Sequence, residues 1–490
     1  MPLLKSDPAS AGFLFAHRPQ GGIRKRLSQF DGAGPPVVCV GIMTDHHPAI
    51  AAHLSHYPET RWVDAFVADQ SGFGYGKRVP IERLASVYRS GLAMSCSAFV
   101  LDNRHHGHDS EGIGWRDGDP DMIAWPIEGR LAPMPWAQVP TAQVMLHALD
   151  KNGAPFWHDP RAILANIVAK LRGDGLHPVI ACELEFYLTD AARNEDGTLR
   201  PPRLSRTGQT MDYPVNAAAL AGEEFALFFD RVHAAAKAQN VSAGLVYVEY
   251  GLGQFEINLD HSSDPVRAAD EAVLLKRIVR GVARSLGYDA TFMAKPFGGE
   301  AGSGFHMHMS LTDEAGANLF AKEGGETMLR HAIGGMKRLL PETLSFFVPN
   351  ANSFKRAGAV FAPVNLAWGE DNRTVAFRIP AGGGQARRVE HRVAGADANP
   401  YLVAAGVLAG AHLGITEKLD PGAPAEGHAG FERDYDLPSD VFAATRRMET
   451  GSLIGRYVPP RYPKLYATLK RGEHQEFLEV VSGREVTFFK

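Results

Sequence analysis

The stretch CELEFYL, residues 182–188, places two glutamates, Glu183 and Glu185, inside an otherwise apolar run. The run predicts a strand, and alternate residues of a strand share one face of the sheet. Glu183 and Glu185 therefore lie side by side on the same face. Two neighbouring carboxylates repel each other and raise each other's pKa, so a shared cation is their natural partner.

The composition of the whole chain indicates a globular protein that handles small molecules. The chain has 490 residues, of which 45% are hydrophobic, and this is enough for a large core and for two domains. Its 51 basic and 55 acidic residues give a formal net charge of -4. This balance gives no electrostatic reason to expect nucleic acid or an anionic membrane as a partner.

Cysteine usage and the N-terminal composition predict a cytoplasmic protein. The cysteines Cys39, Cys96 and Cys182 are widely spaced and odd in number, so they suit a reducing compartment better than a disulfide framework. The N-terminus has no apolar segment of signal-peptide length after a basic start, and no later run approaches the length of a membrane span.

The order of the segments predicts an arm and two domains. Residues 1–34 mix Pro, Gly and Arg, which predicts an N-terminal arm. Residues 35–150 hold short apolar segments broken by Gly and Pro, which predicts a small strand-rich domain with a helix at PIERLASVYRSG. Residues 151–490 form the predicted large domain. A helix opens it at DPRAILANIVAKLRGDG, which starts with Asp-Pro and closes with Gly.

Strands and helices alternate irregularly in the large domain. Helices are predicted at about 222–240, at DPVRAADEAVLLKRIVRGVARSLG (264–287) and at NPYLVAAGVLAGAHLGI (399–415). Strands are predicted at ATFMAKPF (290–297) and FHMHMSL (305–311). This irregular order predicts an α+β fold rather than a doubly wound parallel sheet.

Further acids and histidines repeat the pattern of the first stretch. VYVEYGLGQFEINLD supplies Glu249 and Glu256, with a glycine-containing turn that could return the chain toward the first acids, and FHMHMSL places His306 and His308 on one face. A lone Glu or His in a strand is usually solvated or hydrogen-bonded. Two acid pairs and a histidine pair flanked by core-type residues instead favour a polynuclear metal site. Oxygen ligands with one imidazole suit Mg²⁺ or Mn²⁺ better than structural zinc.

Arginines recur after these acids. NSFKR ends at Arg356, NRTVAFRIP carries Arg373 and Arg378, and RRVEHR contains Glu390 and ends at Arg392. One arginine is usually solvated, but guanidinium groups bind planar or tetrahedral oxyanions through paired hydrogen bonds. Metals together with several arginines predict a site that holds a triphosphate and a carboxylate substrate.

Two other motifs are weaker. GFGYGK (72–77) lacks the spacing of a phosphate-binding loop and the Ser or Thr after its Lys, so we expect a hairpin turn. RHHGHD (104–109) could bind a metal, but three histidines in a loop are usually solvated.

Six ordered motifs together resemble the glutamine synthetase superfamily. They are CELEFYL, VEYGLGQFEIN, FMAKPFGGEAGSGFHMHMSL, NSFKR, NRTVAFRIP and RRVEHRVAGADANPYL. The preceding segment DAFVADQSGFGYGKRVP resembles the branch of γ-glutamylpolyamine synthetases and other glutamate-amine ligases, although Tyr75 stands where that branch commonly has Arg. The resemblance implies a small β-grasp-like domain before a catalytic domain with a curved antiparallel sheet flanked by helices.

The resemblance also implies a role for each matching residue. One metal would be bound by Glu185, Glu249 and Glu256, and the metal on the nucleotide side by Glu183, His306 and Glu390. ATP would contact His308, Ser310, Arg373 and Arg378; glutamate would contact Gly302, Arg356, Arg373 and Arg392; and Arg373, Arg378 and Glu249 would act in catalysis. Two or three Mg²⁺ or Mn²⁺ ions per site are implied, with ATP as co-substrate.

The implied reaction joins the γ-carboxylate of L-glutamate to an amine through a γ-glutamyl phosphate made with ATP. Divalent ions and arginines would hold together two anions that otherwise repel, and a loop near residues 350–365 would close over them to exclude water. Family members are typically two stacked hexameric rings with active sites between neighbouring subunits. The resemblance therefore implies a homo-dodecamer.

The sequence departs from true glutamine synthetases around the ammonia site. GAVFAPV puts Phe361 where their flap has a glutamate, and GLAMSCSAF puts Ser95 where a neighbouring subunit contributes an aspartate. Ala301 replaces the asparagine that usually precedes the glutamate-contacting glycine. An aromatic side chain offers an alkyl amine apolar surface or a cation-π contact, whereas two carboxylates favour NH₄⁺. We therefore expect an organic mono- or polyamine as acceptor and a role in polyamine metabolism.

Other functions stay open. They are an ordinary glutamine synthetase with compensating residues, a non-catalytic metabolite sensor on the same scaffold and, on the metal cluster alone, a binuclear metallohydrolase. Retention of all the proposed metal ligands and arginines argues against the sensor, because a pseudoenzyme has no need for a costly cluster of buried charge. Absence of an ATP requirement would favour the hydrolase.

Overall fold

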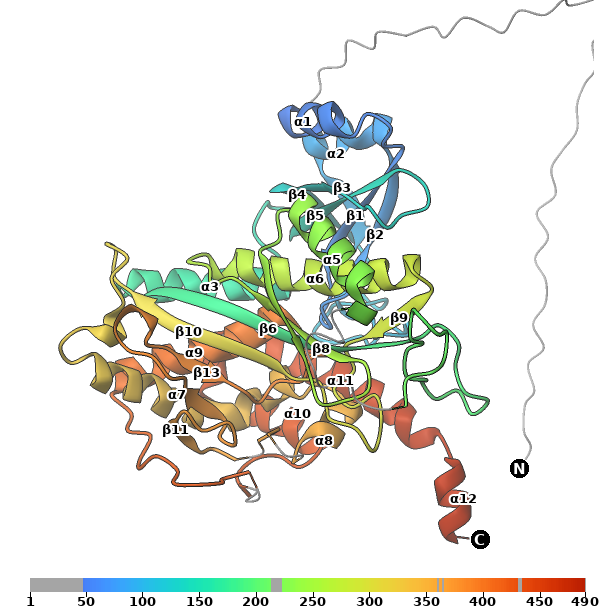
Figure 1. The fold of residues 1–490 in the computed structure, drawn as a ribbon. Coiled ribbons are helices and arrows are strands. Elements are labelled where there is room, and N and C mark those ends of the chain that lie inside the picture. The colour runs from blue at the N-terminus through green and yellow to red at the C-terminus, as the bar shows by residue number, and fades with distance from the viewer. Residues whose placement is uncertain (1–46, 213–222, 359–360, 364, 431–433, 490) are drawn as a thin grey trace, which may run out of the picture. The chain divides into compact units, whose positions relative to one another are not determined.

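The computed structural model describes residues 47–212, 223–358, 361–363, 365–430 and 434–489. Two sheets with helices around them make up these residues, which confirms the α+β fold (Figure 1). The predicted arm, residues 1–34, lies outside the described residues. Within the described ranges, no helix is both long and apolar enough to cross a membrane.

The smaller sheet has five strands in the order β2-β1-β5-β4-β3, with β1 and β5 parallel and the other pairs antiparallel. Its strands are β1 (Trp62–Ala68), β2 (Gly74–Pro80), β3 (Leu92–Ser95), β4 (Asp121–Pro133) and β5 (Thr141–Leu149), with helices α1 (Pro48–His56) and α2 (Leu84–Ser90). The predicted hairpin turn is present between β1 and β2, where Gly72 has a φ of 77°, a value that favours glycine.

The larger sheet has eight strands. Seven follow the order β11-β12-β13-β10-β6-β8-β7, and β9 pairs with the end of β6. They are β6 (His177–Asp190), β7 (Ala243–Val248), β8 (Gln254–Leu259), β9 (Tyr288–Thr291), β10 (Phe305–Thr312), β11 (Trp368–Glu370), β12 (Phe377–Ile379) and β13 (Val389–His391). Figure 1 shows β6 and β10 side by side at the centre of this sheet.

The remaining helices follow β5 along the chain. They are α3 (Pro160–Gly173), α5 (Ala226–Ala238), α6 (Pro265–Ser285), α7 (Gly325–Phe347), α8 (Ala351–Arg356), α9 (Pro400–Glu417), α10 (Val441–Thr450), α11 (Tyr462–Glu479) and α12 (Gly483–Phe489). Three of the predicted helices begin at a capping residue followed by proline: Asp159, Asp264 and Asn399 each accept a hydrogen bond from a backbone N–H of the first turn.

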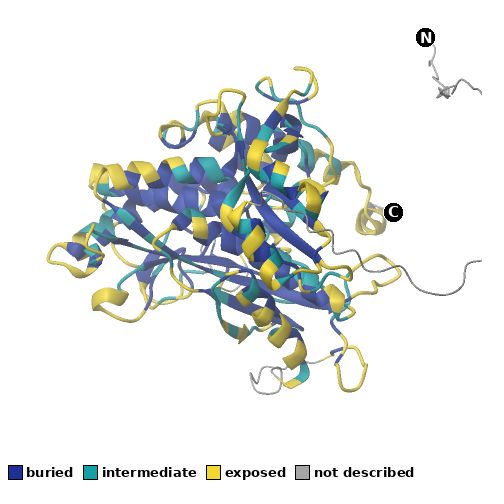
Figure 2. Ribbon diagram, turned by 90° about the horizontal axis from the view of Figure 1, so that it is seen from above, coloured by how far each residue is buried: buried dark blue, intermediate teal, exposed yellow. Residues whose placement is uncertain are grey.

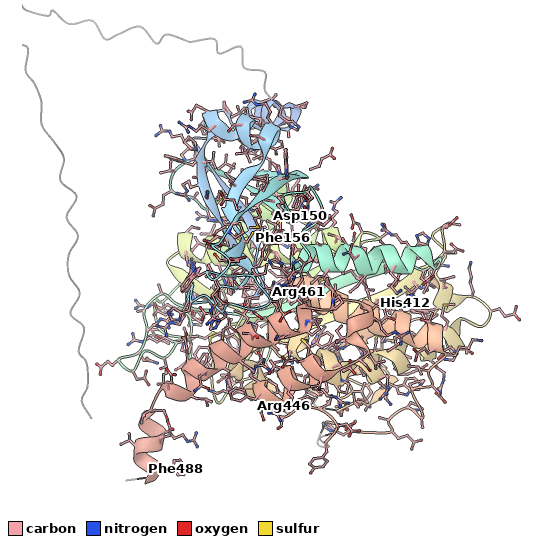
Figure 3. The ribbon with its side chains drawn as sticks, turned by 180° about the vertical axis from the view of Figure 1, so that it is seen from behind. Asp150, Phe156, His412, Arg446, Arg461 and Phe488 are labelled. Carbon is pink, nitrogen blue, oxygen red and sulfur yellow. The ribbon has the colours of Figure 1, made fainter. Side chains whose placement is uncertain are left out.

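Helix α9 is the apolar helix that the sequence predicts to be buried. Its residues from Pro400 to Gly414 are all buried, and the helix packs along α7. Figure 2 shows the buried interior of the protein in dark blue. Near its end His412, labelled in Figure 3, is 2.8 Å from the Tyr457 hydroxyl and 2.7 Å from the Asp174 carboxylate. These bonds connect α9 to the end of α3 and to the segment before α11.

One predicted strand is wrong over most of its length. The strand predicted at residues 290–297 ends at Thr291 as part of β9, and an irregular loop follows. There the backbone N–H and C=O of Lys295 bond to the Asn352 side chain, and Pro296 has no N–H to donate to a ladder. The predicted division between residues 35–150 and residues 151–490 stays a prediction.

Candidate active site

Strand register brings four of the five predicted acids and both histidines to one face of the larger sheet, and the fifth acid, Glu249, directly follows β7. Three antiparallel pairs are involved: Glu183 opposite His306, Glu185 opposite Glu256, and Glu390 opposite His308. Directly opposed residues in antiparallel strands point to the same face. The alternate residues Cys182, Leu184 and Met307 face the other way and are fully buried in the apolar core.

Distances within this acidic cluster suit cations. His308 Nε2 lies 2.7 Å from Glu183 Oε1, and His306 Nδ1 lies 3.5 Å from Glu183 Oε2 and 3.7 Å from Glu390 Oε1. Two sets of ligand atoms each lie within 4.8 Å of one another, one from Glu183, Glu256 and His306 and the other from Glu183, His308 and Glu390. These groupings differ from the two predicted sets, so the assignment of ligands to individual ions stays a prediction. His306 Nε2 is buried without a hydrogen-bond partner, so the residues present fit a metal ion.

The electrostatics of the cluster show crowded negative charge on one side. Burial and then the Glu185 charge raise the pKa of Glu249 to about 7, and burial with the charges of Glu183 and Glu185 raises the pKa of Glu256 to about 9. The pKa of Glu183, which lies beside the histidines, is instead lowered. Burial alone would raise this pKa, but hydrogen bonds from His306 and His308 have the larger effect. A divalent ion would relieve the repulsion and keep all these acids ionised.

Arginines border the cluster with unused donors. Arg378 Nη1 lies 2.8 Å from Glu390 Oε2, and Arg392 pairs with the other oxygen of the same carboxylate. Arg356 is buried and donates to the Val393 carbonyl at 3.0 Å. The Nε–H groups of Arg356, Arg378 and Arg392 are all buried without a hydrogen-bond partner. Buried unpaired donors of this kind suit oxyanion ligands.

Arg373 differs from these three arginines in its exposure. It is exposed, and it acts on the cluster through its charge, which lowers the pKa of Glu249 against the dominant effect of burial. Ser310 follows His308 by two residues on β10 and is half-buried. Their predicted contacts with ATP, glutamate or the transferred phosphate stay predictions.

Glycines make close packing possible beside the cluster. A Cβ on Gly302 would lie 2.6 Å from Arg356 Cγ, and one on Gly304 would lie 2.7 Å from Arg356 Nη2 and 2.8 Å from His306 Nε2. The Gly304 N–H also donates to Glu185 Oε2 at 2.8 Å. Only glycine allows this approach without displacing the neighbours.

Sequence reasoning missed three residues of the site. Gln254 donates to Glu185 Oε2 and to the Gly302 carbonyl, both at 3.0 Å, and Arg388 Nε donates to His308 Nδ1 at 3.1 Å. Gly304 is the third. All three lie inside the motifs quoted above, close in sequence to a predicted site residue. That closeness is the sequence signal from which a role in the site could have been inferred.

The two candidates for the amine site, Ser95 and Phe361, make no described contact with the acidic cluster of the same chain. Ser95 ends β3 of the smaller sheet and accepts a hydrogen bond from Ser97 Oγ at 3.2 Å. Phe361 is 42% exposed and has a φ of 65°, and its neighbours 359–360 and 364 lie outside the described residues. Within the described ranges, no hydrogen bond or ion pair connects either residue to the cluster, so both roles stay predictions.

The histidine loop differs from expectation at one residue. His105 and His106 are exposed, but His108 is only 17% exposed and its Nε2 lies 2.9 Å from Asp102 Oδ2. His106 Nδ1 lies 2.5 Å from Glu476 Oε1 on α11. The prediction of a solvated loop is therefore wrong for His108, because its ring packs against the rest of the chain.

Known proteins match most of the chain, including the strands that carry the acidic cluster. A family model described as the catalytic domain of glutamine synthetase matches residues 157–489. γ-Glutamylputrescine synthetase of Escherichia coli (strain K12) is 35% identical over 444 residues, covering 89% of this chain and 93% of the relative. Glutamate–isopropylamine ligase of a Pseudomonas species is 35% identical over 437 residues, covering 85% of this chain and 92% of the relative.

Glutamine synthetases are also similar to this chain, at lower identity, and solved structures share the fold. Glutamine synthetase of Thermococcus kodakarensis is 28% identical over 440 residues, covering 88% of this chain and 93% of the relative. A solved complex of GmaS with ADP superposes with a TM-score of 0.76 at 25% identity, covering 90% of this chain and 98% of the solved chain.

Proposed function

The chain belongs to the glutamine synthetase family and is an ATP-dependent ligase, and from this premise we propose that it joins the γ-carboxylate of L-glutamate to an organic amine. The proposal rests on an acidic cluster that lies beside three arginines whose Nε–H groups are buried without a hydrogen-bond partner. Such a site holds two anions together, as the transfer of phosphate from ATP to a carboxylate requires.

The metal ligands divide into two sets. Glu185, Glu249 and Glu256 would hold one divalent ion, and Glu183, His306 and Glu390 the ion on the nucleotide side. When bound, two or three Mg²⁺ or Mn²⁺ ions would neutralise the triphosphate and the carboxylate. Gln254 and the Gly304 N–H orient the Glu185 carboxylate through hydrogen bonds of 3.0 and 2.8 Å, so this ligand is positioned before the ion binds.

The chain's own groups then position the two substrates. Arg356, Arg392 and the Gly302 backbone would bind glutamate, and His308, held between Glu183 and Arg388, would face ATP together with Ser310. Arg373 and Arg378 would stabilise the charge that develops on the transferred phosphate. The amine would then attack the γ-glutamyl phosphate, forming the new C–N bond as phosphate leaves.

An organic amine is favoured over ammonium by charge and by similarity. Phe361 and Ser95 carry no negative charge at the positions where true glutamine synthetases have acids. The two relatives at 35% identity are named for putrescine and isopropylamine, whereas the archaeal glutamine synthetase is 28% identical. The protein would work as a homo-dodecamer in the cytoplasm, with Ser95 reaching the active site of a neighbouring subunit.

The test is ADP release with glutamate, ATP, Mg²⁺ and a panel of amines at matched free-base concentration, with mass analysis of the product. We expect a γ-glutamyl amide and faster turnover with at least one alkyl mono- or diamine than with ammonium. Ammonium outperforming every amine would make the protein an ordinary glutamine synthetase. If neither ammonium nor any amine stimulates ADP release, the result would favour the non-catalytic sensor.

A further inference from the structure

A second cavity lies away from the acidic cluster. It has a volume of about 420 Å³, a size typical of small-molecule sites, and none of the six proposed metal ligands lines it. Its walls come from the β1–β2 turn, α6, the loop after β9, the start of α8 and the end of α11. None of the residues proposed to bind metal, ATP or glutamate lines the cavity.

Two cations from successive turns of α6 line this cavity. Lys276 and Arg280 are four residues apart, so their side chains lie on the same side of the helix. In the part of the chain that the structure describes, neither forms an ion pair with a carboxylate. Lys276 Nζ donates to the Ala398 carbonyl at 2.8 Å, which leaves two of its three N–H groups for another acceptor.

Arg280 is held in place without using its hydrogen-bond donors. Its guanidinium lies 5.0 Å from the ring centroids of both Phe73 and Phe292, and both rings line the cavity. No hydrogen bond from Arg280 to a described residue is formed. Aromatic contacts therefore fix the group while its N–H edge stays available, which is the arrangement that binds a planar carboxylate through two bonds.

Four acids line the cavity, and each already has partners within the chain. Glu473 pairs with Lys470 at 2.8 Å, Glu476 with Arg104 at 3.2 Å, and Asp102 with His108 at 2.9 Å. Asp397 accepts hydrogen bonds from the Asn350 and Ser353 side chains at 2.9 and 2.6 Å, and its free oxygen is buried. The lining cations Lys470 and Arg104 are used in these ion pairs, so Lys276 and Arg280 are the lining cations left without a carboxylate partner among the described residues.

The apolar part of the cavity wall indicates what the rest of the ligand is like. Met293 and Phe477 are 40% and 64% exposed and line the cavity with the two rings that hold Arg280, so an apolar body has partners there. Burial, with the nearby Arg280 charge, lowers the pKa of Lys276 to about 7, so a bound anion would favour its protonated form. The four acids that line the cavity repel a doubly charged phosphate more than a singly charged carboxylate.

We propose that this cavity is a second binding site, separate from the catalytic cluster, for a small carboxylic acid with an apolar body. Its carboxylate binds the Arg280 guanidinium and the Lys276 ammonium, and its body lies against Phe73, Phe292 and Met293.

Binding of 4-bromophenylacetate to the full-length protein tests the site, by calorimetry with ATP, Mg²⁺ and glutamate absent and then present. We expect binding in both conditions and a dissociation constant raised at least tenfold by Arg280→Gln, since the variant loses a charge-assisted pair. Arg284→Gln is the matched control, because Arg284 is one turn further along α6, pairs with Asp289 and does not line the cavity; it should leave the constant unchanged. Equal affinity in the Arg280 variant, or competition with the substrates, would overturn the proposal.

Diffraction from wild-type crystals soaked in the same probe gives a test that does not depend on a folded variant. An anomalous bromine peak beside Phe73 and Phe292, with the carboxylate on Arg280, is the expected result. A peak confined to the catalytic cluster, or a protein segment of another subunit filling the cavity, would overturn the proposal.

Discussion

Replacing Gly304 by alanine tests how tightly the catalytic cluster is packed. The new Cβ would lie 2.7 Å from Arg356 Nη2, 2.8 Å from His306 Nε2 and 3.0 Å from Glu185 Oε1. To restore ordinary contacts of 3.4 Å, these atoms must retreat by about 0.4–0.7 Å. Since a 1 Å misplacement costs on the order of 100-fold in rate, we expect kcat/KM to fall about 10- to 100-fold.

The assay is amine-dependent ADP release at 25 °C, with the Mg²⁺ concentration for half-maximal rate measured in parallel. Overpacking costs about 1–3 kcal/mol of stability, so urea unfolding should show that the variant is still folded under assay conditions. Gly298→Ala is the matched control, because a Cβ there meets nothing within 4 Å, and it should keep its activity within about twofold. A folded Gly304→Ala variant with wild-type kinetics would refute the packing argument.

Three further predictions follow. Glu249→Gln removes a proposed metal ligand and should abolish amine-dependent ADP formation; full activity would contradict the ligand assignment. Gln254→Leu removes a donor that orients Glu185 and should raise the Mg²⁺ requirement about 10- to 100-fold while the fold, checked by circular dichroism, is retained. His158 is buried with both ring nitrogens unpaired, and burial lowers its pKa to about 3. Because the unfolded chain binds this proton near pH 6.5 and the folded chain does not, stability is lost as pH falls from 6.5 toward 3. His158→Leu should therefore reduce the difference between the unfolding free energies at pH 7 and pH 5 by about 2 kcal/mol. Urea unfolding at the two pH values measures this difference. An unchanged difference would contradict the burial of His158 in its neutral form.

Local patterns in the sequence predicted the parts of the site that depend on one strand or one helix end. The two-residue period placed Glu183 beside Glu185 and His306 beside His308, because side-chain direction in a strand alternates whatever its neighbours are. In the same way Asp159 followed by proline marked the start of α3, since the cap and the first turn are local.

Features that depend on distant segments could not be predicted in this way. The register that sets Glu183 opposite His306 joins strands more than a hundred residues apart, and no short pattern encodes it. The strand predicted at residues 290–297 failed partly for the same reason, because the distant Asn352 side chain holds the Lys295 backbone. Pro296, which lies inside the predicted strand, was a local signal against it that the prediction overlooked. Gln254 has an ordinary polar identity, and only its contact with Glu185 shows its role.

Anomalous diffraction from crystals grown with Mn²⁺, glutamate and a non-hydrolysable ATP analogue tests the central claim most directly. We predict one manganese peak bonded by Glu185, Glu249 and Glu256, and a second bonded by Glu183, His306 and Glu390. Crystals that hold the nucleotide but show no peak at these carboxylates, or show one only beside Asp102, His106 and Glu476, would contradict the account.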